Sequence, residues 1–280
     1  MRSFVVIGVV GLASIAAAQQ AGTMVDGVAI PAGVSGAITW GPSHGRECHR
    51  YHGRRMCEGP RRVPAPSTAE AARAAALGIT SGAARRVLVE RPRASWVAEV
   101  ASAPASDLAW PVDGGRVWRG FGIHAGIAVG PGGRLRRTRR RHPHEGIDIG
   151  AARGTPILAA NDGLVVYSDN GMTGYGNAVL VVHADASVTL YGHCTATFVV
   201  AGQRVARGEV IAAVGDTGLA HGAHLHFELH VDGHAVDPLP LIAPPGPPAA
   251  VAPPPDVAGG TQSPQDRGVE VMPREELDAP

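Results

Sequence analysis

Short apolar runs separated by glycine-rich turns dominate the chain from Trp110 to Pro238. The runs are shorter than an average helix and rich in Val, Ile and Tyr, which is typical of strands. They read GRVWRGFG, PILAA, GLVVYS, NAVLVVH, SVTLYGH, EVIAAVG and HLHFELHV. The pattern predicts a mainly β domain over residues 105–239, built as an antiparallel sheet or a barrel-like sheet.

The last of these runs alternates strictly between apolar and polar residues, which predicts a strand with two different faces. One face carries Leu225, Phe227 and Leu229, and the other carries His224, His226 and Glu228. Two histidines at alternate positions aim two imidazoles into one small volume. Neutral imidazole is the commonest metal ligand and an acid or base near neutral pH. An isolated pair of this kind is as often structural, so the rest of the chain must decide.

A second polar group, His144-Glu145-Gly146-Ile147-Asp148, lies just before another apolar run. A straight strand would hold His144 and Asp148 about 13 Å apart, whereas metal ligands each lie about 2 Å from the ion. The glycines and β-branched residues of this stretch disfavour a helix. We therefore expect a turn at Gly146 and a strand that begins near Asp148, with Ile147 and Ile149 facing the core.

His144, Asp148 and one histidine of the alternating pair would form a set of three protein ligands. Three ligands leave a position open for water, which is typical of a catalytic rather than a structural zinc site. The other histidine of the pair and His193, at the end of TLYGH, are candidates for proton transfer. Glu228 shares the histidine face and is a candidate for orienting a ligand. His230 is interpreted as an ordinary structural or surface histidine.

The segments on either side of this domain differ from it in composition. Residues 67–104 read as short helices, since Ser67-Thr68-Ala69-Glu70 forms a capping box before an Ala-rich stretch. Further helices are expected near Ala83–Glu90 and Ser95–Ala101. Residues 240–280 are rich in proline and polar residues, so we expect a disordered tail.

The first residues have the pattern of a secretory signal peptide over 1–18: Arg2, an apolar run, and Ala16–Ala18 before the expected cleavage site. The run is too short for a convincing membrane span, so we expect a secreted or periplasmic protein with no span after cleavage. Residues 19–66 read as a linker. Within it we expect a disulfide between Cys48 and Cys57; a second metal site with nearby histidines is the alternative.

Charge excludes one class of partner. The chain has 25 basic and 24 acidic residues, a net charge of +1, which argues against nucleic-acid binding. Six arginines nevertheless lie in the loop expected from Arg134 to Arg141. This loop either contacts an anionic envelope polymer or is simply solvated. The third cysteine, Cys194, is expected in the core.

Several blocks occur in an order that resembles the lysostaphin/LytM-type zinc metallopeptidases, the duplicated-hybrid-motif peptidoglycan endopeptidases. They are WPVDGGRVWRGFG, HEGIDIGAARGTPILAANDGLVVYS, GYGNAVLVVH, TLYGH, GQRVARGEVIAAVGDTG and AHLHFEL. The resemblance covers a little under half the chain. It implies that His144, Asp148 and His226 bind one Zn²⁺ per chain and that His193 and His224 are catalytic.

The resemblance also implies a substrate and a reaction. It predicts hydrolysis of peptide cross-bridges in bacterial peptidoglycan, with His224 as general base and His193 as the hydrogen-bond donor to the oxyanion, two roles that could be exchanged. The alternative is a non-catalytic or latent regulator that binds the wall and activates other hydrolases. All five positions are intact, which favours an enzyme.

Overall fold

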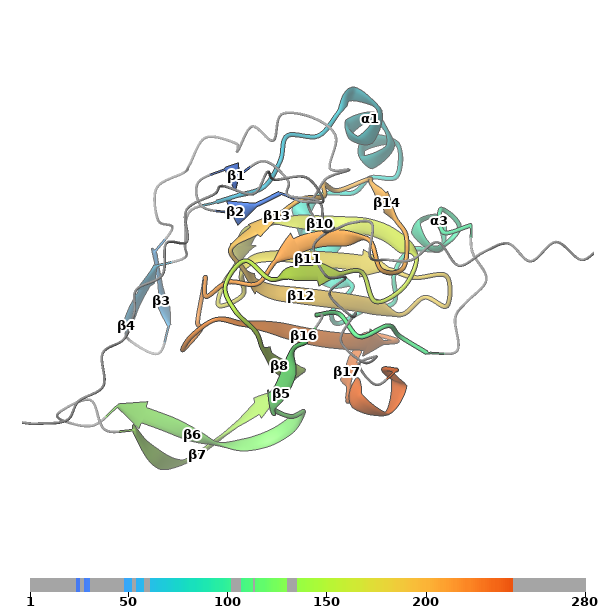
Figure 1. Ribbon diagram of the computed structural model, residues 1–280. Helices are drawn as coiled ribbons and strands as arrows, with labels where there is room; N and C mark the ends of the chain where they lie inside the picture. The colour runs from blue at the N-terminus through green and yellow to red at the C-terminus, as the bar shows by residue number, and fades with distance from the viewer. Residues whose placement is uncertain are drawn as a thin grey trace, which may run out of the picture. The chain divides into compact units, whose positions relative to one another are not determined.

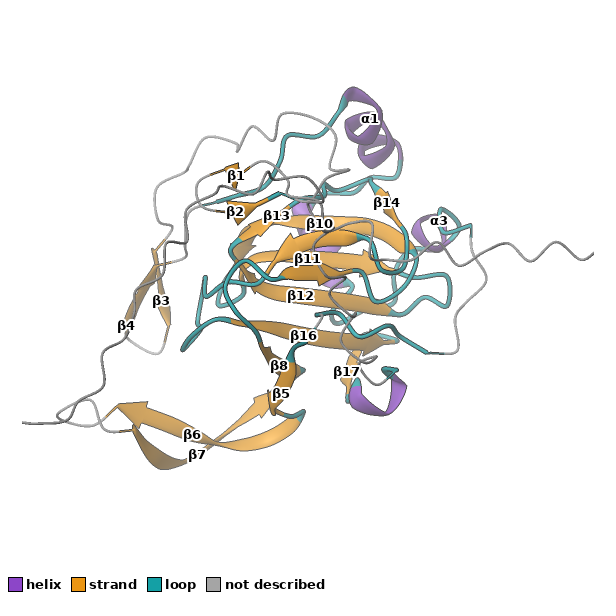
Figure 2. Ribbon diagram, in the orientation of Figure 1, coloured by secondary structure: helices purple, strands orange, loops and turns teal. Residues whose placement is uncertain are grey.

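The computed structural model describes residues 24–25, 28–30, 48–51, 54–57, 61–101, 107–112, 114–129 and 135–243. For residues 24–25, 28–29, 48–51, 54–57, 125–129 and 135–142 it describes the backbone alone. Strands predominate (Figure 2). The helices are α1 (Thr68–Ala76), α2 (Ser81–Arg86), α3 (Ala94–Val97) and the 3-10 helix η3 (Leu239–Leu241). The strands are β1 (Met24–Val25), β2 (Val28–Ala29), β3 (Cys48–Tyr51), β4 (Arg54–Cys57), β5 (Arg116–Arg119), β6 (Gly122–Val129), β7 (Leu135–His144), β8 (Ile147–Gly150), β9 (Pro156–Leu158), β10 (Gly163–Met172), β11 (Gly176–Val182), β12 (Val188–Cys194), β13 (Ala196–Thr197), β14 (Arg204–Val205), β15 (Val210–Ala213), β16 (His224–Val231) and β17 (His234–Val236).

One large sheet has the strand order β14-β10-β11-β12-β16-β8-β5, with β17 added beside β16 (Figure 1). Its described strand pairs are all antiparallel. The predicted mainly β, antiparallel fold is thus confirmed, and the sheet is open, with β14 and β5 at its edges. A second sheet, β13-β15-β9, has three strands.

The two faces of the large sheet have different covers. Val179 and Val181 of β11 join one buried cluster with Ile157 and Ala212 of the small sheet. The residues that alternate with them, Ala178, Leu180 and Val182, join another buried cluster together with residues of the helices. Because both faces of β10 to β12 are buried, these strands read as nearly continuous apolar runs rather than alternating ones.

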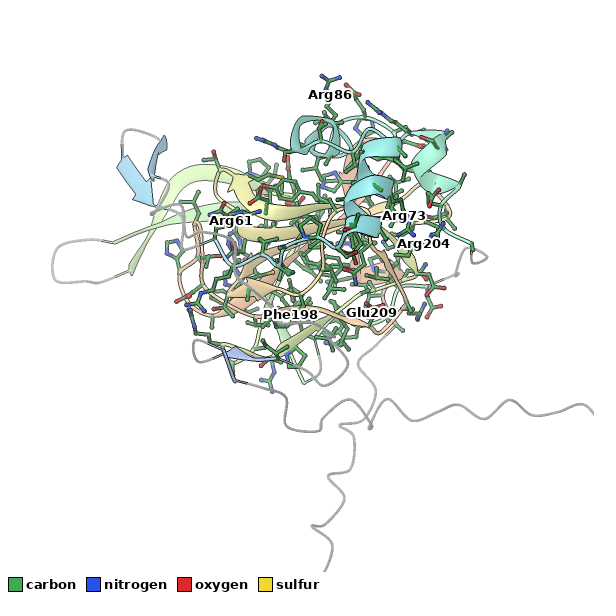
Figure 3. The ribbon with its side chains drawn as sticks, turned by 90° about the horizontal axis from the view of Figure 1, so that it is seen from above. Arg61, Arg73, Arg86, Phe198, Arg204 and Glu209 are labelled. Carbon is green, nitrogen blue, oxygen red and sulfur yellow. The ribbon has the colours of Figure 1, made fainter. Side chains whose placement is uncertain are left out.

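The helical segment packs on the sheet. The expected capping box begins α1: the Glu70 amide donates to Ser67 Oγ, and the Ser67 amide donates to the Glu70 carboxylate. Trp96 of α3 is fully buried, and its Nε1–H donates to the Leu77 carbonyl at 2.9 Å. On the outside, Arg73 and Arg204 (both labelled in Figure 3) pair with the Glu99 carboxylate. These contacts fasten a segment that carries no site residue of its own.

The second and third helices are shorter than predicted. The second runs over Ser81–Arg86 rather than Ala83–Glu90, because the Thr80 hydroxyl accepts the Ala83 amide and starts the helix early. The third runs over Ala94–Val97 rather than Ser95–Ala101. Propensity alone places helix ends poorly, since tertiary contacts decide where such short elements stop.

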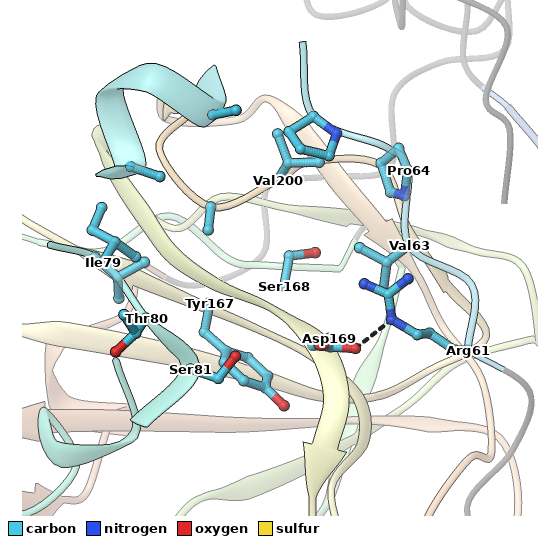
Figure 4. Close-up of a pocket in the computed structure, with 15 residues that line it drawn as sticks. Arg61, Val63, Pro64, Ile79, Thr80, Ser81, Tyr167, Ser168, Asp169 and Val200 are labelled. Carbon is cyan, nitrogen blue, oxygen red and sulfur yellow. Dashed lines mark hydrogen bonds and ion pairs between the residues drawn. The ribbon is translucent and has the colours of Figure 1, made fainter. Parts of the chain in front are cut away.

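A cavity of about 300 Å³ lies between the helical segment and β10 (Figure 4). Ile79, Thr80 and Ser81 line it on one side, and Tyr167 and Ser168 line it on the other. The Arg61–Asp169 ion pair, at 2.6 Å, also borders it. None of the five predicted site residues is among the residues that line this cavity.

The prediction of a loop from Arg134 to Arg141 is wrong, because most of this segment is a strand. From Leu135 to His144 the chain is strand β7, paired with β6 in an antiparallel hairpin. Pairing with β6 satisfies the backbone hydrogen bonds of this segment. A run of charged residues in the sequence gives no sign of such pairing, so the strand could not be predicted from it. The side chains from Arg136 to Arg141 lie outside the described part, so contact with an anionic polymer stays a prediction.

Other predictions concern the ends of the chain. The predicted signal peptide at 1–18 and most of the predicted tail at 240–280, from residue 244 onward, lie outside the described residues. Cys48 and Cys57 are directly opposite each other in the β3–β4 hairpin. Their side chains are not described, and the disulfide stays a prediction. Among the described residues no helix is long and apolar enough to cross a membrane.

Candidate metal centre

The five predicted residues come from four neighbouring elements and lie together. Asp148 is on β8, His224 and His226 are on β16, His193 is on β12, and His144 ends β7. In the sheet, His226 is the partner of Asp148 on one side and of Gly192 on the other. The rings of His193 and His224 have centroids 4.7 Å apart, and those of His144 and His226 are 4.9 Å apart.

A turn at Gly146 brings His144 back over Asp148, as the sequence predicted. A Cβ atom at Gly146 would lie 2.3 Å from the Phe227 carbonyl oxygen, so only glycine lets the turn pass this close to β16. Ile147 and Ile149 are fully buried in the core, which leaves Asp148 on the opposite face of β8.

Three potential ligand atoms converge at this point. Asp148 Oδ1 lies 3.0 Å from His144 Nε2 and 2.9 Å from His226 Nδ1, and the two nitrogens are 3.2 Å apart. Tetrahedral zinc with bonds of about 2.0–2.1 Å separates its ligand atoms by about 3.3 Å. The three residues therefore fit a tetrahedral metal ion of this size.

The far nitrogen of each ligand ring is held by an acceptor. His144 Nδ1 lies 2.7 Å from the Gly120 carbonyl, and His226 Nε2 lies 2.8 Å from Glu228 Oε1. We assign a proton to each of these nitrogens, because an oxygen acceptor faces it. In the neutral rings, the converging nitrogens, His144 Nε2 and His226 Nδ1, then carry lone pairs. Two lone pairs beside a carboxylate repel one another, and a cation bound at this point would remove that repulsion.

The pKa shifts of Asp148 and His226 are consistent with a cation site at this point. Burial alone would raise the pKa of Asp148, but its contacts with His144 and His226 outweigh that effect and hold the pKa far below its usual range. Burial alone would lower the pKa of His226, yet Asp148 and Glu228 raise it to about 9. Without a metal this ring carries a second proton, on Nδ1, at neutral pH, so metal binding releases that proton and frees the lone pair of Nδ1.

His193 and His224 face the same site but are oriented differently from the ligands. Their Nδ1 atoms each lie 2.8 Å from a carbonyl oxygen, that of Thr217 for His193 and that of Gly222 for His224. A neutral ring held this way carries its proton on Nδ1 and presents Nε2 as an acceptor. His193 also has a positive φ of 62°, a backbone conformation that is uncommon outside glycine and recurs at active sites.

Burial keeps both of these imidazoles neutral. It lowers the pKa of His193 to about 3, and the positive charge of His226 acts in the same direction. Burial also lowers the pKa of His224, but the Gly222 carbonyl and the Asp148 charge oppose it. His224 Nε2 lies 3.6 Å from Asp148 Oδ1, and the charge of that carboxylate favours a proton on the His224 ring.

A chain of buried hydrogen bonds runs from the ligand His226 to the helical segment. Glu228 accepts from His226 and from the Tyr175 hydroxyl at 2.8 Å, and its other oxygen lies 2.7 Å from His230 Nε2. His230 Nδ1 in turn lies 3.0 Å from the carbonyl of Leu88, which follows α2. The interpretation of His230 as a structural or surface histidine does not include this link, although His230 continues the same alternation as His224 and His226.

Removing the charge of Glu228 is expected to weaken metal binding. Glu228→Gln keeps the side-chain shape but loses the carboxylate that fixes His226 and makes it a stronger ligand. Such changes typically cost 10–100-fold in metal affinity. Competition with a chromophoric chelator measures it, with Glu209→Gln as a control on a glutamate outside the site. Wild-type affinity in Glu228→Gln would show that this carboxylate does not orient the ligand.

Cys194 lies in the core, as expected, and is fully buried. Burial raises the pKa of its thiol to about 12, so the thiolate form is absent at neutral pH. Cys194 is therefore interpreted as a core residue, and it is not one of the three residues that cluster at this site.

Comparison with known proteins gives a consistent result. Residues 142–238 match the sequence profile described as Peptidase family M23. A "DD-carboxypeptidase/endopeptidase Mpg" of Neisseria meningitidis serogroup B is 42% identical over 112 residues, which are 38% of this chain and 26% of that protein. The "Murein hydrolase activator NlpD" of Salmonella typhimurium is 36% identical over 138 residues, 49% of this chain and 32% of that protein.

A solved structure is also similar. The catalytic domain of the antimicrobial peptidase lysostaphin from Staphylococcus simulans is 27% identical, with a TM-score of 0.38, over 45% of this chain and 90% of that one.

The chain spans only about a quarter to a third of the length of the two curated relatives, the Mpg protein and the NlpD protein.

Proposed function

We propose that this chain, whose residues 142–238 belong to peptidase family M23, is an exported, zinc-dependent endopeptidase that cleaves peptide cross-bridges of bacterial peptidoglycan. The observation that carries the proposal is the convergence of His144, Asp148 and His226 on one point, with two further imidazoles facing it. A metal-binding or structural role would need the first three residues alone. The family membership and the name of the Mpg relative support the choice of substrate.

The chain's own residues supply the proton transfers. His144, Asp148 and His226 would hold the ion and leave one position open. When bound, zinc would polarise the scissile carbonyl and make water easier to deprotonate. His224 accepts the proton of the attacking water at Nε2 and then passes it to the leaving amine.

His193 takes a role that differs from the sequence-based expectation of an oxyanion donor. Its Nδ1–H is engaged by the Thr217 carbonyl, so the neutral ring has no proton on Nε2 to donate. We propose that His193 Nε2 accepts a hydrogen bond from the attacking water and orients it, while His224 removes the other proton. Orientation of the reactant in this way contributes to the rate by lowering the entropy lost in the reaction.

A second candidate function is a regulator of other hydrolases, since one relative is named as a murein hydrolase activator. It is weaker, because a regulator does not need His193 and His224 poised beside a complete ligand set. Export is proposed from the signal-like pattern at 1–18.

Digestion of isolated peptidoglycan by the purified protein tests the proposal. We expect soluble peptides with newly formed amino and carboxyl termini, identified by mass spectrometry, in the absence of any other protein. Release of peptides only when an amidase is added would support the regulator instead.

A further inference from the structure

An irregularity in β5 changes which of its side chains face the metal centre. In the pairing of β5 with β8, Val117 is the partner of Ile149 and Arg119 is the partner of Asp148. Ile149 and Asp148 are consecutive in β8, whereas their partners in β5 are two positions apart. Trp118, which lies between those partners, is therefore the extra residue of a β-bulge. Without the bulge, alternation would turn Arg119 toward the core. With it, Arg119 lies on the same face as Asp148.

Trp118 lies on this face as well. Its indole meets the His224 ring edge-on, with centroids 5.3 Å apart, and is 58% exposed. The indole also lies beside the partner strand, since a Cβ atom at Gly150 would be in ordinary van der Waals contact with Trp118 Cδ1, at 3.9 Å. An indole this exposed, fixed against a proposed catalytic histidine, is a surface on which a substrate can pack.

Arg119 adds a positive charge at the same place. Its Nη1 lies 3.8 Å from Asp148 Oδ2, and its side chain is 40% exposed. The distance between Arg119 Nη1 and Asp148 Oδ2 is long for an ion pair. The contact engages only one nitrogen of the guanidinium group, which has five N–H donors. A divalent ion bound by Asp148 would compete for the negative charge of that carboxylate. The guanidinium would then be available to another anion.

We propose that Trp118 and Arg119 form a substrate subsite that binds a free carboxylate close to the scissile bond. The proposal rests on the proposed peptidase function and names its substrate class, a peptide with a free carboxylate rather than a carboxamide. Residues of an extended peptide are spaced about 3.3–3.6 Å apart. Because Arg119 borders a metal ligand, the carboxylate it holds lies within about two residues of the bond that is cut. Arginine suits this role since it pairs with a carboxylate through two parallel hydrogen bonds.

The test compares two peptides that differ only in a free carboxylate or a carboxamide at the carboxyl end and are cut at the same bond. We expect wild type to prefer the carboxylate peptide by roughly 10–100-fold in kcat/KM, the range for a hydrogen bond to a charged group. In Arg119→Gln the ratio should fall close to one, mainly through KM. Arg153→Gln removes the charge of an exposed arginine that pairs with Asp216, and it should keep the wild-type ratio.

Two results would overturn the subsite: a wild-type ratio near one, or an unchanged ratio in Arg119→Gln. A third would reassign Arg119: weaker zinc binding in Arg119→Gln with equal losses on both peptides would mean that it acts through Asp148. Trp118→Ala should raise KM for both peptides, and Trp118→Phe should restore part of the loss.

Direct binding separates failure of the subsite from failure of the proposed function. Calorimetry with zinc-loaded His193→Ala protein should still show tighter binding of the carboxylate peptide. If wild type cleaves neither peptide but this preference is present, the subsite stands and the peptidase proposal fails. If the preference is absent, the subsite fails whatever the activity.

Discussion

Asp148→Ala and His226→Ala are each expected to lose the metal ion and peptidoglycan hydrolysis together. Either change leaves only two protein ligands, whereas zinc in proteins is held by at least three. Asp148 is also the group that both ligand histidines contact, at 3.0 Å and 2.9 Å. Its removal leaves two imidazole nitrogens facing each other with no negative charge between them.

Elemental analysis of protein purified without added metal measures this. Wild type should carry about one zinc ion per chain, and each variant should carry almost none. His234→Ala is a matched control, because it removes an exposed histidine outside the site and should keep the ion. Circular dichroism would verify that the variants are folded. A variant that retains zinc at the wild-type level would show that the residue is not a ligand.

His193→Ala and His224→Ala are expected to separate metal binding from catalysis. Both side chains face the site with Nε2 as an acceptor, but neither belongs to the three-ligand cluster. Each variant should therefore keep its zinc and lose hydrolysis. Removing one general acid–base group typically lowers the rate by 10²–10⁴-fold.

Zinc content and the release of peptides from isolated peptidoglycan are measured on the same preparations. The two variants should also differ from each other. His224→Ala should lose more activity than His193→Ala, because proton removal depends on His224 and orientation of the water on His193. If both variants instead stimulate wall breakdown as well as wild type, the protein is a regulator and the catalytic assignment fails.

The sequence predicted the placement of the candidate site residues well where that placement follows from a local pattern. The alternation in β16 and the glycine turn at 146 are both visible as spacings, and each spacing allows one backbone solution. The choice between His224 and His226 as the ligand could not be made this way, since both lie on the same face of one strand. The resemblance to a family supplied that choice, and the contacts of His226 Nδ1 with Asp148 and His144 agree with it.

Other features depend on pairing between distant segments and leave no local trace. The bulge at Trp118 is a property of the β5–β8 register, and the position of Arg119 follows from it. Likewise, strand β7 exists because β6 pairs with it, although its sequence reads as a charged loop. The hydrogen bond from His230 to the Leu88 carbonyl joins residues 142 positions apart. Propensity and periodicity describe single elements, so they cannot report such contacts.

Titration of metal-free protein with zinc, followed by digestion of isolated peptidoglycan, tests whether one ion held by His144, Asp148 and His226 is required for peptide hydrolysis. We predict no release of peptides from the metal-free protein, and activity that rises with added zinc to a plateau at about one ion per chain. Full release of peptides by the metal-free protein would contradict the account.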